Sequence, residues 1–513
     1  MSDQAGPELA DVRRYGRRMV TRFVDKAREA ERPTLATLLT THLGLPADRL
    51  PVADQQWPAY EHVNVQAALD AWLAEPGREH EVVGIAGYRH RGSMGLADML
   101  GQLPEEAKYG PRPGNVARTS LPAGPDGETR ECLRVAIVLA ADAEGRCAIL
   151  FRGPDSEDGR DSTTVEVIAD KEGAGAAIAA RLADLAVEHN VYRGQVVSFG
   201  QSIFGRHGSI LRFHHREPLS AEELILPEET FADLRRQVVG VARHRDALRA
   251  ARQHLKRGLL LYGPPGVGKT HTVRFLIGEL ADTTIVQLSG DTLHAIKQAC
   301  SIARTLQPAM IVVEDVDLIA QQRDMYDGGA PLLFMLLNEM DGLEEDADVV
   351  FLLTTNRADL LEGALASRPG RVDQAVHIGL PDREARRRLV ELYRGGLDLD
   401  ETRLDGVLDR TDGVTASFLK ELLRRAAVVA ADAVRDPSGG TSGGTSGGAP
   451  GEAVRVTADD LESALDDLLD TRNRMTRRAL GLDDGQGPPA PVQTKSAVGE
   501  QRGIGPGFAP SGG

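Results

Sequence analysis

The stretch GLLLYGPPGVGKTHTV, residues 258–273, decides the fold. It opens with an apolar segment, residues 259–262, that is long enough for a buried strand. A glycine-rich run follows that fits the spacing G-x-x-x-x-G-K-[ST], and an apolar-periodic segment comes next. Strand, loop and helix in this order are the context that a phosphate-binding loop requires. A glycine turn with a chance lysine is the alternative, and this context argues against it.

The chemistry of such a loop follows from its residue types. Glycines let successive main-chain N–H groups converge on phosphate oxygens, and the following helix adds its positive N-terminal end. Lys269 is expected to reach the β- and γ-phosphates of ATP, and the Thr270 hydroxyl to ligate Mg²⁺. The predicted nucleotide contacts in this segment are Gly263, Pro264, Pro265, Gly266, Val267, Gly268, Lys269, Thr270 and His271.

A second segment, MIVVEDVDLI at residues 310–319, reads as a buried strand that ends in carboxylates. In P-loop ATPases an acid at the end of a neighbouring strand helps to hold Mg²⁺, and the next acid orients the attacking water. Most of them have the order Asp then Glu, whereas this chain has Glu then Asp. Alignment on the apolar run places Glu314 in the metal position and Asp315 in the water-polarising position, with Asp317 as a third acid. Three solvent-exposed acids after a strand are the alternative.

Composition limits the other function classes. The chain has 513 residues, which predicts two or three domains, and a formal net charge of −16, which argues against a uniformly basic surface for DNA. Its three cysteines are far apart and lack metal-type spacing, as is usual in a reducing compartment. We found neither an apolar run of about 18 residues nor a secretory h-region, so we expect a cytoplasmic protein.

The predicted secondary structure changes along the chain and divides it into regions. Residues 1–226 predict an N-terminal α/α+β region for substrate or partner binding, helical over 8–75 and then rich in strands. Alternating strands and helices over 227–380 predict an α/β subdomain with a parallel sheet. Residues 381–482 read as helical, with a Gly/Ser-rich insertion at 437–452 and Thr457 as an N-cap, and 483–513 as a disordered tail.

Beyond the two motifs, five further segments occur in a fixed order. They are LLNEMDGL (336–343), VVFLLTTNRADLL (349–361), ASRPGRVDQAV (366–376) and the helical LPDREARRRLVELYR (380–394) with GVTASFLKELLRRAA (413–427). With these segments the chain resembles the AAA+ ATPases, and among them the AAA clade, over residues 228–480. The resemblance implies a P-loop parallel sheet with a C-terminal helical lid.

The resemblance also assigns residues. Asn356 matches the residue that orients the attacking water, and Arg368 and Arg371 match two arginine fingers that serve the neighbouring subunit. Gly240, in QVVGV, resembles the segment that contacts the adenine. The implied assembly is a ring, most often a homohexamer, in which ATP and water give ADP and phosphate.

The Glu-Asp order is similar to that of the mitochondrial inner-membrane AAA translocase of folded Rieske protein. The short segment between Gly290 and Pro308 also resembles that group, and it lacks the aromatic–apolar–Gly loop with which unfolding members grip a polypeptide. Leu293, His294 and Ile296 are the nearest substitutes. The sequence has no H-E-x-x-H motif for a fused zinc protease.

Three functions follow as hypotheses. The first is an ATP-hydrolysing ring that remodels or moves a protein recognised by residues 1–226, whose identity the sequence does not reveal. The second is a nucleotide-gated scaffold with little or no turnover. The third, a motor on DNA, is disfavoured by the acidic balance and by the lack of a basic stripe with interleaved aromatic residues.

Overall fold

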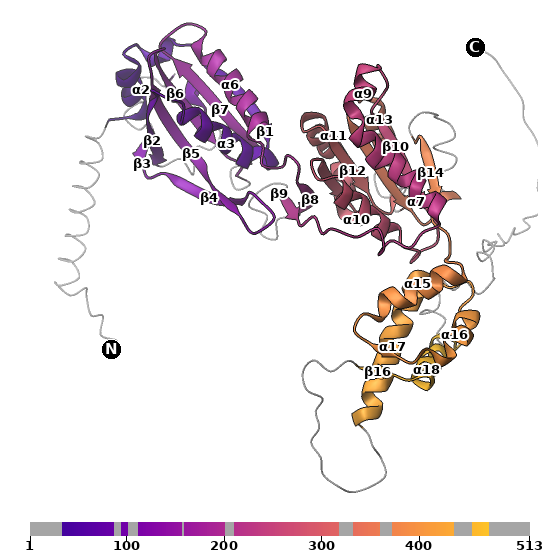
Figure 1. The fold of residues 1–513 in the computed structure, drawn as a ribbon. Coiled ribbons are helices and arrows are strands. Elements are labelled where there is room, and N and C mark those ends of the chain that lie inside the picture. Colours follow the sequence, from indigo (N-terminus) through magenta and orange to yellow (C-terminus); the bar gives the residue numbers. More distant parts are fainter. Residues whose placement is uncertain are drawn as a thin grey trace, which may run out of the picture. The chain divides into compact units, whose positions relative to one another are not determined.

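The computed structural model of the chain describes residues 33–86, 94–100, 111–155, 159–200, 210–317, 332–359, 372–435 and 454–470. The chain divides into two compact units, Met1–Leu392 and Tyr393–Gly513. Figure 1 shows the helices and strands of both. The predicted Gly/Ser-rich insertion and the predicted disordered tail lie outside the described residues.

The first sheet of the first unit is antiparallel. Its strands have the order β1-β7-β6-β5-β2-β3, and β4 pairs with the N-terminal half of β5 while β2 pairs with the C-terminal half. This sheet and its helices confirm the predicted α+β region. The strands are β1 (Ala53–Pro58), β2 (Glu79–Ala86), β3 (Arg112–Gly114), β4 (Ala117–Pro122), β5 (Thr129–Ala141), β6 (Arg146–Arg152) and β7 (Ser162–Ala169).

Helices cover both faces of the first sheet (Figure 1), which explains why its central strands are apolar on both sides. Val138 and its cross-strand partner Ile149 pack with α3 and α6, and the next pair, Ile137 and Leu150, packs with α2 and α4. The helices are α2 (Leu35–Leu43), α3 (His62–Leu73), α4 (Leu96–Leu100) and α6 (Ala174–Glu188), with 3-10 turns η1 (Ala47–Arg49) and η2 (Ala59–Glu61).

Strand β1 corrects the expectation that residues 8–75 are helical. Its sequence, ADQQWP, is mostly polar and exposed, so it carries neither the apolar alternation of a half-buried strand nor a helical period. Its pairing with β7 comes from the long-range register Ala53↔Val167 through Pro58↔Ser162. This is an edge strand of the sheet, where Pro58 is tolerated.

The second sheet has the order β14-β10-β13-β12-β11-β8-β9 and is parallel except for the β8–β9 pair. It confirms the predicted parallel α/β sheet. The strands are β8 (Val196–Gly200), β9 (Ile210–His214), β10 (Arg257–Tyr262), β11 (Thr284–Leu288), β12 (Ala309–Val313), β13 (Val349–Thr355) and β14 (Gln374–His377). The helices are α7 (Glu228–Arg235), α8 (Val241–Arg243), α9 (Arg245–Ala250), α10 (Lys269–Glu279), α11 (Ile296–Thr305) and α13 (Leu332–Asp341), with turns η5 (Arg236–Gly240) and η6 (Gly290–Ala295).

Two strands of the second sheet come from the region that the sequence analysis placed before residue 227. Strand β8 pairs in parallel with β11, and β9 closes the edge. The Tyr60 ring meets Phe199 edge-on at 5.9 Å, and the Tyr192 hydroxyl donates to the Tyr60 carbonyl at 2.5 Å. The first sheet is thus joined to the second through packed side chains as well as through the chain.

The second unit is mainly helical, as predicted for the lid. Thr457 is the predicted N-cap: its hydroxyl accepts from the Asp460 N–H, and the Asp460 carboxylate accepts from the Thr457 N–H, which completes a capping box. Helix α15 (Arg383–Arg394) leads into this unit. The other elements are β15 (Asp398–Leu399), η8 (Glu401–Arg403), α16 (Leu404–Arg410), α17 (Ala416–Arg435), β16 (Arg455–Val456) and α18 (Ala458–Leu469).

Candidate nucleotide-binding and catalytic site

The glycine-rich loop joins β10 to α10 at the carboxyl edge of the second sheet. Gly263, Gly266 and Gly268 have φ values of 154°, 80° and 107°, which side chains rarely allow. A Cβ on Gly263 would also collide with the carbonyl oxygen of Ile378. The glycines at these three positions are therefore required by the backbone, and α10 begins directly after them at Lys269.

Lys269 lies inside the loop and is 7% exposed. Its Nζ donates to the carbonyl oxygens of Gly263 and Pro264, both at 2.9 Å, and to Asn356 Oδ1 at 2.7 Å. Burial lowers the pKa of Lys269, and the carboxylates of Asp315 and Asp317 oppose that shift. The arrangement holds an ammonium group within the loop curl, where a phosphate-binding lysine is needed.

Glu314 follows the fully buried strand β12 and meets the start of α10. Its Oε2 accepts a hydrogen bond from the Thr270 hydroxyl at 3.0 Å. A hydroxyl and a carboxylate side by side are hard oxygen donors of the kind that Mg²⁺ prefers. The chemistry of the two residues therefore fits a magnesium ion bound together with nucleotide phosphates, and their role as metal ligands stays a prediction.

Asp315 points to a different partner. Its Oδ1 accepts from Asn356 Nδ2 at 3.1 Å, and its own N–H donates to the Thr354 hydroxyl at 3.1 Å. The φ of Asp315 is 52°, a left-handed conformation that aspartate adopts more readily than most residues. The backbone thus favours the shorter acid at the second position, which gives a physical reason for the Glu-Asp order.

Asn356 connects the loop lysine to the second acid, because its amide oxygen accepts from Lys269 and its amide nitrogen donates to Asp315. Asp317, which the sequence offered as a third acid, holds it there. The buried Asp317 accepts from the Asn356 N–H at 3.2 Å and from the Thr355 hydroxyl at 2.9 Å. The signal for this support was present in the two threonines that end β13.

The remaining predicted site residues differ in how far the structure describes them. Gly240 ends η5, which packs against α10, the helix that follows the glycine-rich loop. His271 is part of the first turn of α10. Arg368 and Arg371 lie outside the described residues, so their predicted action on a neighbouring subunit stays a prediction.

The segment in place of a pore loop is described, and it is packed into the core. Leu293 and Ile296 are 3% and 1% exposed and belong to the cluster beneath the second sheet, while His294 is exposed. The apolar substitutes are therefore not available to grip a polypeptide in this structure.

Within the described ranges, no three His, Cys, Asp or Glu side chains gather as metal ligands would. In the same part of the chain, no helix combines the length and the apolar character needed to cross a membrane.

Comparison with known proteins agrees with this geometry. Residues 259–380 match the model of the ATPase family associated with various cellular activities, AAA. The chain is 35% identical over 207 residues to the ATP-dependent zinc metalloprotease FtsH 2 of Sphaerobacter thermophilus, covering 38% of this chain and 31% of that protein. It is 32% identical over 188 residues to the 26S proteasome regulatory subunit 6B homolog of Dictyostelium discoideum, covering 34% and 46%.

A third relative is the ATPase family protein 2 homolog of Caenorhabditis elegans, which is 31% identical over 216 residues, or 40% of this chain and 30% of that protein. The chain thus spans less than half the length of each of these relatives. The family match coincides with the glycine-rich loop, the strand-end acids and Asn356. Residues 259–380 are therefore an AAA ATPase domain.

Proposed function

We propose that this protein hydrolyses ATP within a ring of its own copies and uses the turnover to move or remodel a protein partner bound by residues 1–226. The observation that carries the proposal is the bridge through Asn356, whose amide contacts Lys269 Nζ at 2.7 Å and Asp315 Oδ1 at 3.1 Å. A site built only to hold nucleotide has no need to couple a phosphate-binding lysine to a second acid.

Each residue of the proposed site has a distinct task. The N–H groups of the glycine-rich loop and the Lys269 ammonium bind the phosphates, and Thr270 with Glu314 would hold Mg²⁺, whose positive charge offsets the charge on the phosphates. Asp315 accepts the hydrogen bond of the attacking water, and Asn356 fixes its direction. Hydrolysis in this scheme is mostly positioning and charge stabilisation.

The ring is the second part of the proposal, and a homohexamer is its expected size. Arg368 and Arg371 are proposed to complete the site of the neighbouring copy, and an arginine finger of this kind contributes about 10³–10⁵ in kcat. The first test is ATP turnover per chain as a function of protein concentration, with Lys269→Ala as the blank. We expect the rate per chain to rise with concentration and to vanish in the blank.

Mixing two inactive variants tests the action between subunits. A Lys269→Ala chain keeps Arg368 but lacks its own ATP site, and an Arg368→Ala chain has the reverse defect. In an equal mixture, roughly a quarter of the interfaces would combine a complete site with an arginine from the neighbour, so turnover should reappear. An Arg368→Ala chain that hydrolyses ATP at the wild-type rate would refute this part.

The alternative is a nucleotide-gated scaffold that assembles with ATP but does not turn it over. The shorter acid at position 315 is the observation that favours it, because a displacement near 1 Å can cost about 10² in rate. Tight ATP binding without phosphate release above the Lys269→Ala blank, at all protein concentrations, would select the scaffold.

The nature of the partner and the compartment remain proposals as well. We propose a protein partner because the net charge of −16 disfavours nucleic acid. Because Leu293 and Ile296 are buried, we propose that the partner is engaged by the N-terminal region rather than gripped by this segment. The cytoplasm, without membrane attachment, is the compartment that we propose.

A further inference from the structure

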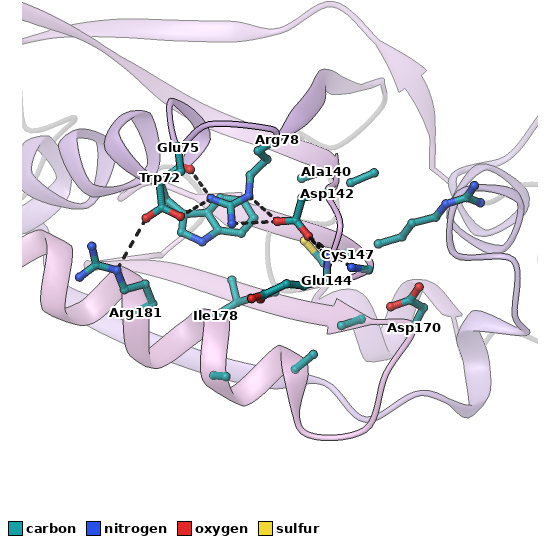
Figure 2. Close-up of a pocket in the computed structure, with 16 residues that line it drawn as sticks. Trp72, Glu75, Arg78, Ala140, Asp142, Glu144, Cys147, Asp170, Ile178 and Arg181 are labelled. Atoms are coloured by element: carbon teal, nitrogen blue, oxygen red, sulfur yellow. Dashed lines mark hydrogen bonds and ion pairs between the residues drawn. The ribbon is translucent and has the colours of Figure 1, made fainter.

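The first sheet contains a cavity that lies outside the ATPase domain. Its volume is about 340 Å³, and it is bordered by the C-terminal end of α3, the hairpin between β5 and β6, the end of β7 and one side of α6. Figure 2 shows the residues that line it. This volume is near the lower end of the range of roughly 300–1,000 Å³ that is usual for ligand pockets, so it suits one side chain or a small group.

Part of the cavity lining consists of small side chains. Ala140 and Ala169 form part of its floor and are 1% and 4% exposed, and Ala177 lines it from α6. The Cys147 thiol also lines the cavity, and burial raises its pKa to about 12, so it behaves as a small apolar group. The floor is therefore apolar.

One wall of the cavity is held rigidly by charged groups. The Arg78 guanidinium lies 3.7 Å from the centre of the Trp72 ring. It donates to Asp142 Oδ2 at 2.9 and 3.1 Å and to Glu75 Oε2 at 2.8 Å, as Figure 2 shows. These bonds pair one guanidinium with two carboxylates, and they fix the shape of the cavity in advance of binding.

Four carboxylates and three arginines line the cavity, and two of the carboxylates have no partner among the described residues. Among the described residues, no hydrogen bond or ion pair engages the side-chain carboxylate of Asp170 or of Glu144, and both residues line the cavity. The ammonium of Lys171 is engaged by the main-chain oxygen of Glu144 rather than by either carboxylate.

Two arginines at the cavity have partners. Arg146 donates to the carbonyl of His42 at 3.1 Å. Arg181 pairs with Glu75 at 3.7 Å and with Glu188 at 3.6 Å. A ligand would therefore meet an apolar floor beside two unpaired carboxylates.

We propose that this cavity, named here the α6 cavity, binds a protein segment in which a bulky apolar residue stands next to a lysine or arginine. The apolar side chain fills the space over Ala140, Ala169 and Ala177, and the cation pairs with Asp170 and Glu144. This inference rests on the proposed function, because it names the class of segment by which a partner protein is recognised.

The chain offers a built-in reporter for the test. It has two tryptophans, Trp57 and Trp72, so a Trp57→Phe variant leaves only the one in the wall of the cavity. The probe is the peptide acetyl-Ser-Gly-Phe-Lys-Gly-Ser-amide, titrated to millimolar concentration into the full chain without ATP. We expect saturable changes in Trp72 emission, weakened about tenfold or more when Phe is replaced by Ala or Lys by Glu.

Matched variants locate the binding. Ala177→Leu fills the cavity and should weaken peptide binding about tenfold or more, whereas Ala180→Leu, on the same helix but outside the cavity, should not. Asp170→Asn should weaken binding severalfold and reduce its salt dependence, with the exposed Asp184→Asn as its control. Equal binding of the Lys and Glu peptides, or unchanged binding by Ala177→Leu, would overturn the inference.

Failure of the peptide site can be distinguished from failure of the proposed ATP hydrolysis. ATP turnover is measured on the same preparations in the absence of peptide. Turnover without any response of Trp72 emission would refute the peptide site and leave the proposed ATPase intact. Peptide binding that depends on Ala177 and Asp170, without turnover above the Lys269→Ala blank, would support the cavity and refute hydrolysis.

Discussion

The two seven-stranded sheets of this chain present their chemistry in opposite ways. In the second sheet, parallel strands end at one edge, and a loop, two acids and an asparagine meet there within hydrogen-bonding distance. In the first sheet, antiparallel strands carry no motif, and the cavity beside α6 is built by small residues and by an ionic network between distant segments.

This difference explains what each region reveals in its sequence. The carboxyl ends of parallel strands converge, so short motifs at strand ends come together whatever the loops between them do. In the antiparallel sheet the contacts are long-range: Arg78 and Asp142 are 64 residues apart, and neither stands in a motif. The comparison predicts that the two regions can be damaged separately.

The largest effect is expected at the glycine-rich loop. Lys269→Ala removes the ammonium that meets the phosphates, and turnover should fall about 10³-fold or more. Urea unfolding followed by Trp72 emission in the Trp57→Phe background should be unchanged, because Lys269 belongs to the second sheet. A shift of that unfolding transition would break the separation between the sheets.

The support of Asn356 is the next test. Asp317→Asn keeps the size of the side chain but weakens its bonds to the Asn356 N–H and the Thr355 hydroxyl. We expect kcat to fall about 10²-fold with little change in ATP affinity, because Asn356 is misplaced while the loop is intact. Asp346→Asn, on an exposed loop, is the control, and a change in affinity instead of kcat would argue for a general loss of structure.

The first sheet should lose stability when the ion pairs of Arg78 are removed. Arg78→Met keeps the stem over Trp72 but leaves Asp142 without a cation and Glu75 with Arg181 alone, and should lower the free energy of unfolding by about 2 kcal/mol. Trp72 emission during urea unfolding measures it, with the exposed Arg118→Met as control. ATP turnover that falls together with stability would contradict the separation.

The contribution of Asp142 to stability should depend on pH. Burial would raise the pKa of Asp142, but hydrogen bonds from the Glu144 N–H and from Arg78 outweigh burial and lower it below the ordinary 3.8. The stabilisation from this carboxylate is therefore present above pH 3.8 and is lost as the pH falls through the lowered value.

The smallest change in stability is expected at Glu61, where the two sheets join. Unlike the loss of Arg78, it should be a gain in the free energy of unfolding. Burial raises the pKa of Glu61 above 4.5, although Asn64 and Asn190 donate to its Oε2 and oppose the shift. The ionised form therefore costs stability, and the cost grows as the pH rises above 4.5. Glu61→Gln keeps an acceptor for both donors and should raise the free energy of unfolding at pH 8.

Urea unfolding of the Glu61→Gln chain at pH 4 and pH 8 checks that prediction, with Glu79→Gln on the exposed end of β2 as control. The gain should disappear toward pH 4, where Glu61 is protonated. A gain that is equal at both pH values would show that charge is not its cause.

The sequence predicted the fold of the second sheet and the residue types of its site, but it did not predict all of the contacts between those residues. The glycine pattern at 263–268 and the acids after β12 were readable because main-chain geometry demands those residue types. The left-handed backbone of Asp315 and the support from Asp317 were not, since both depend on contacts between strands. Strands β1, β8 and β9 were missed or misplaced because their pairing is long-range.

The central claim is that the two acids have different roles. Glu314 holds the magnesium ion, and Asp315 accepts the hydrogen bond of the attacking water. The most direct measurement compares Asp315→Asn with Glu314→Gln for ATP affinity, for turnover and for the Mg²⁺ concentration that gives half-maximal turnover. We predict that Asp315→Asn binds ATP as the wild type does but turns it over about 10²–10⁴-fold more slowly, whereas Glu314→Gln raises the Mg²⁺ requirement. A raised Mg²⁺ requirement in Asp315→Asn, with Glu314→Gln losing turnover at unchanged Mg²⁺ dependence, would contradict the account.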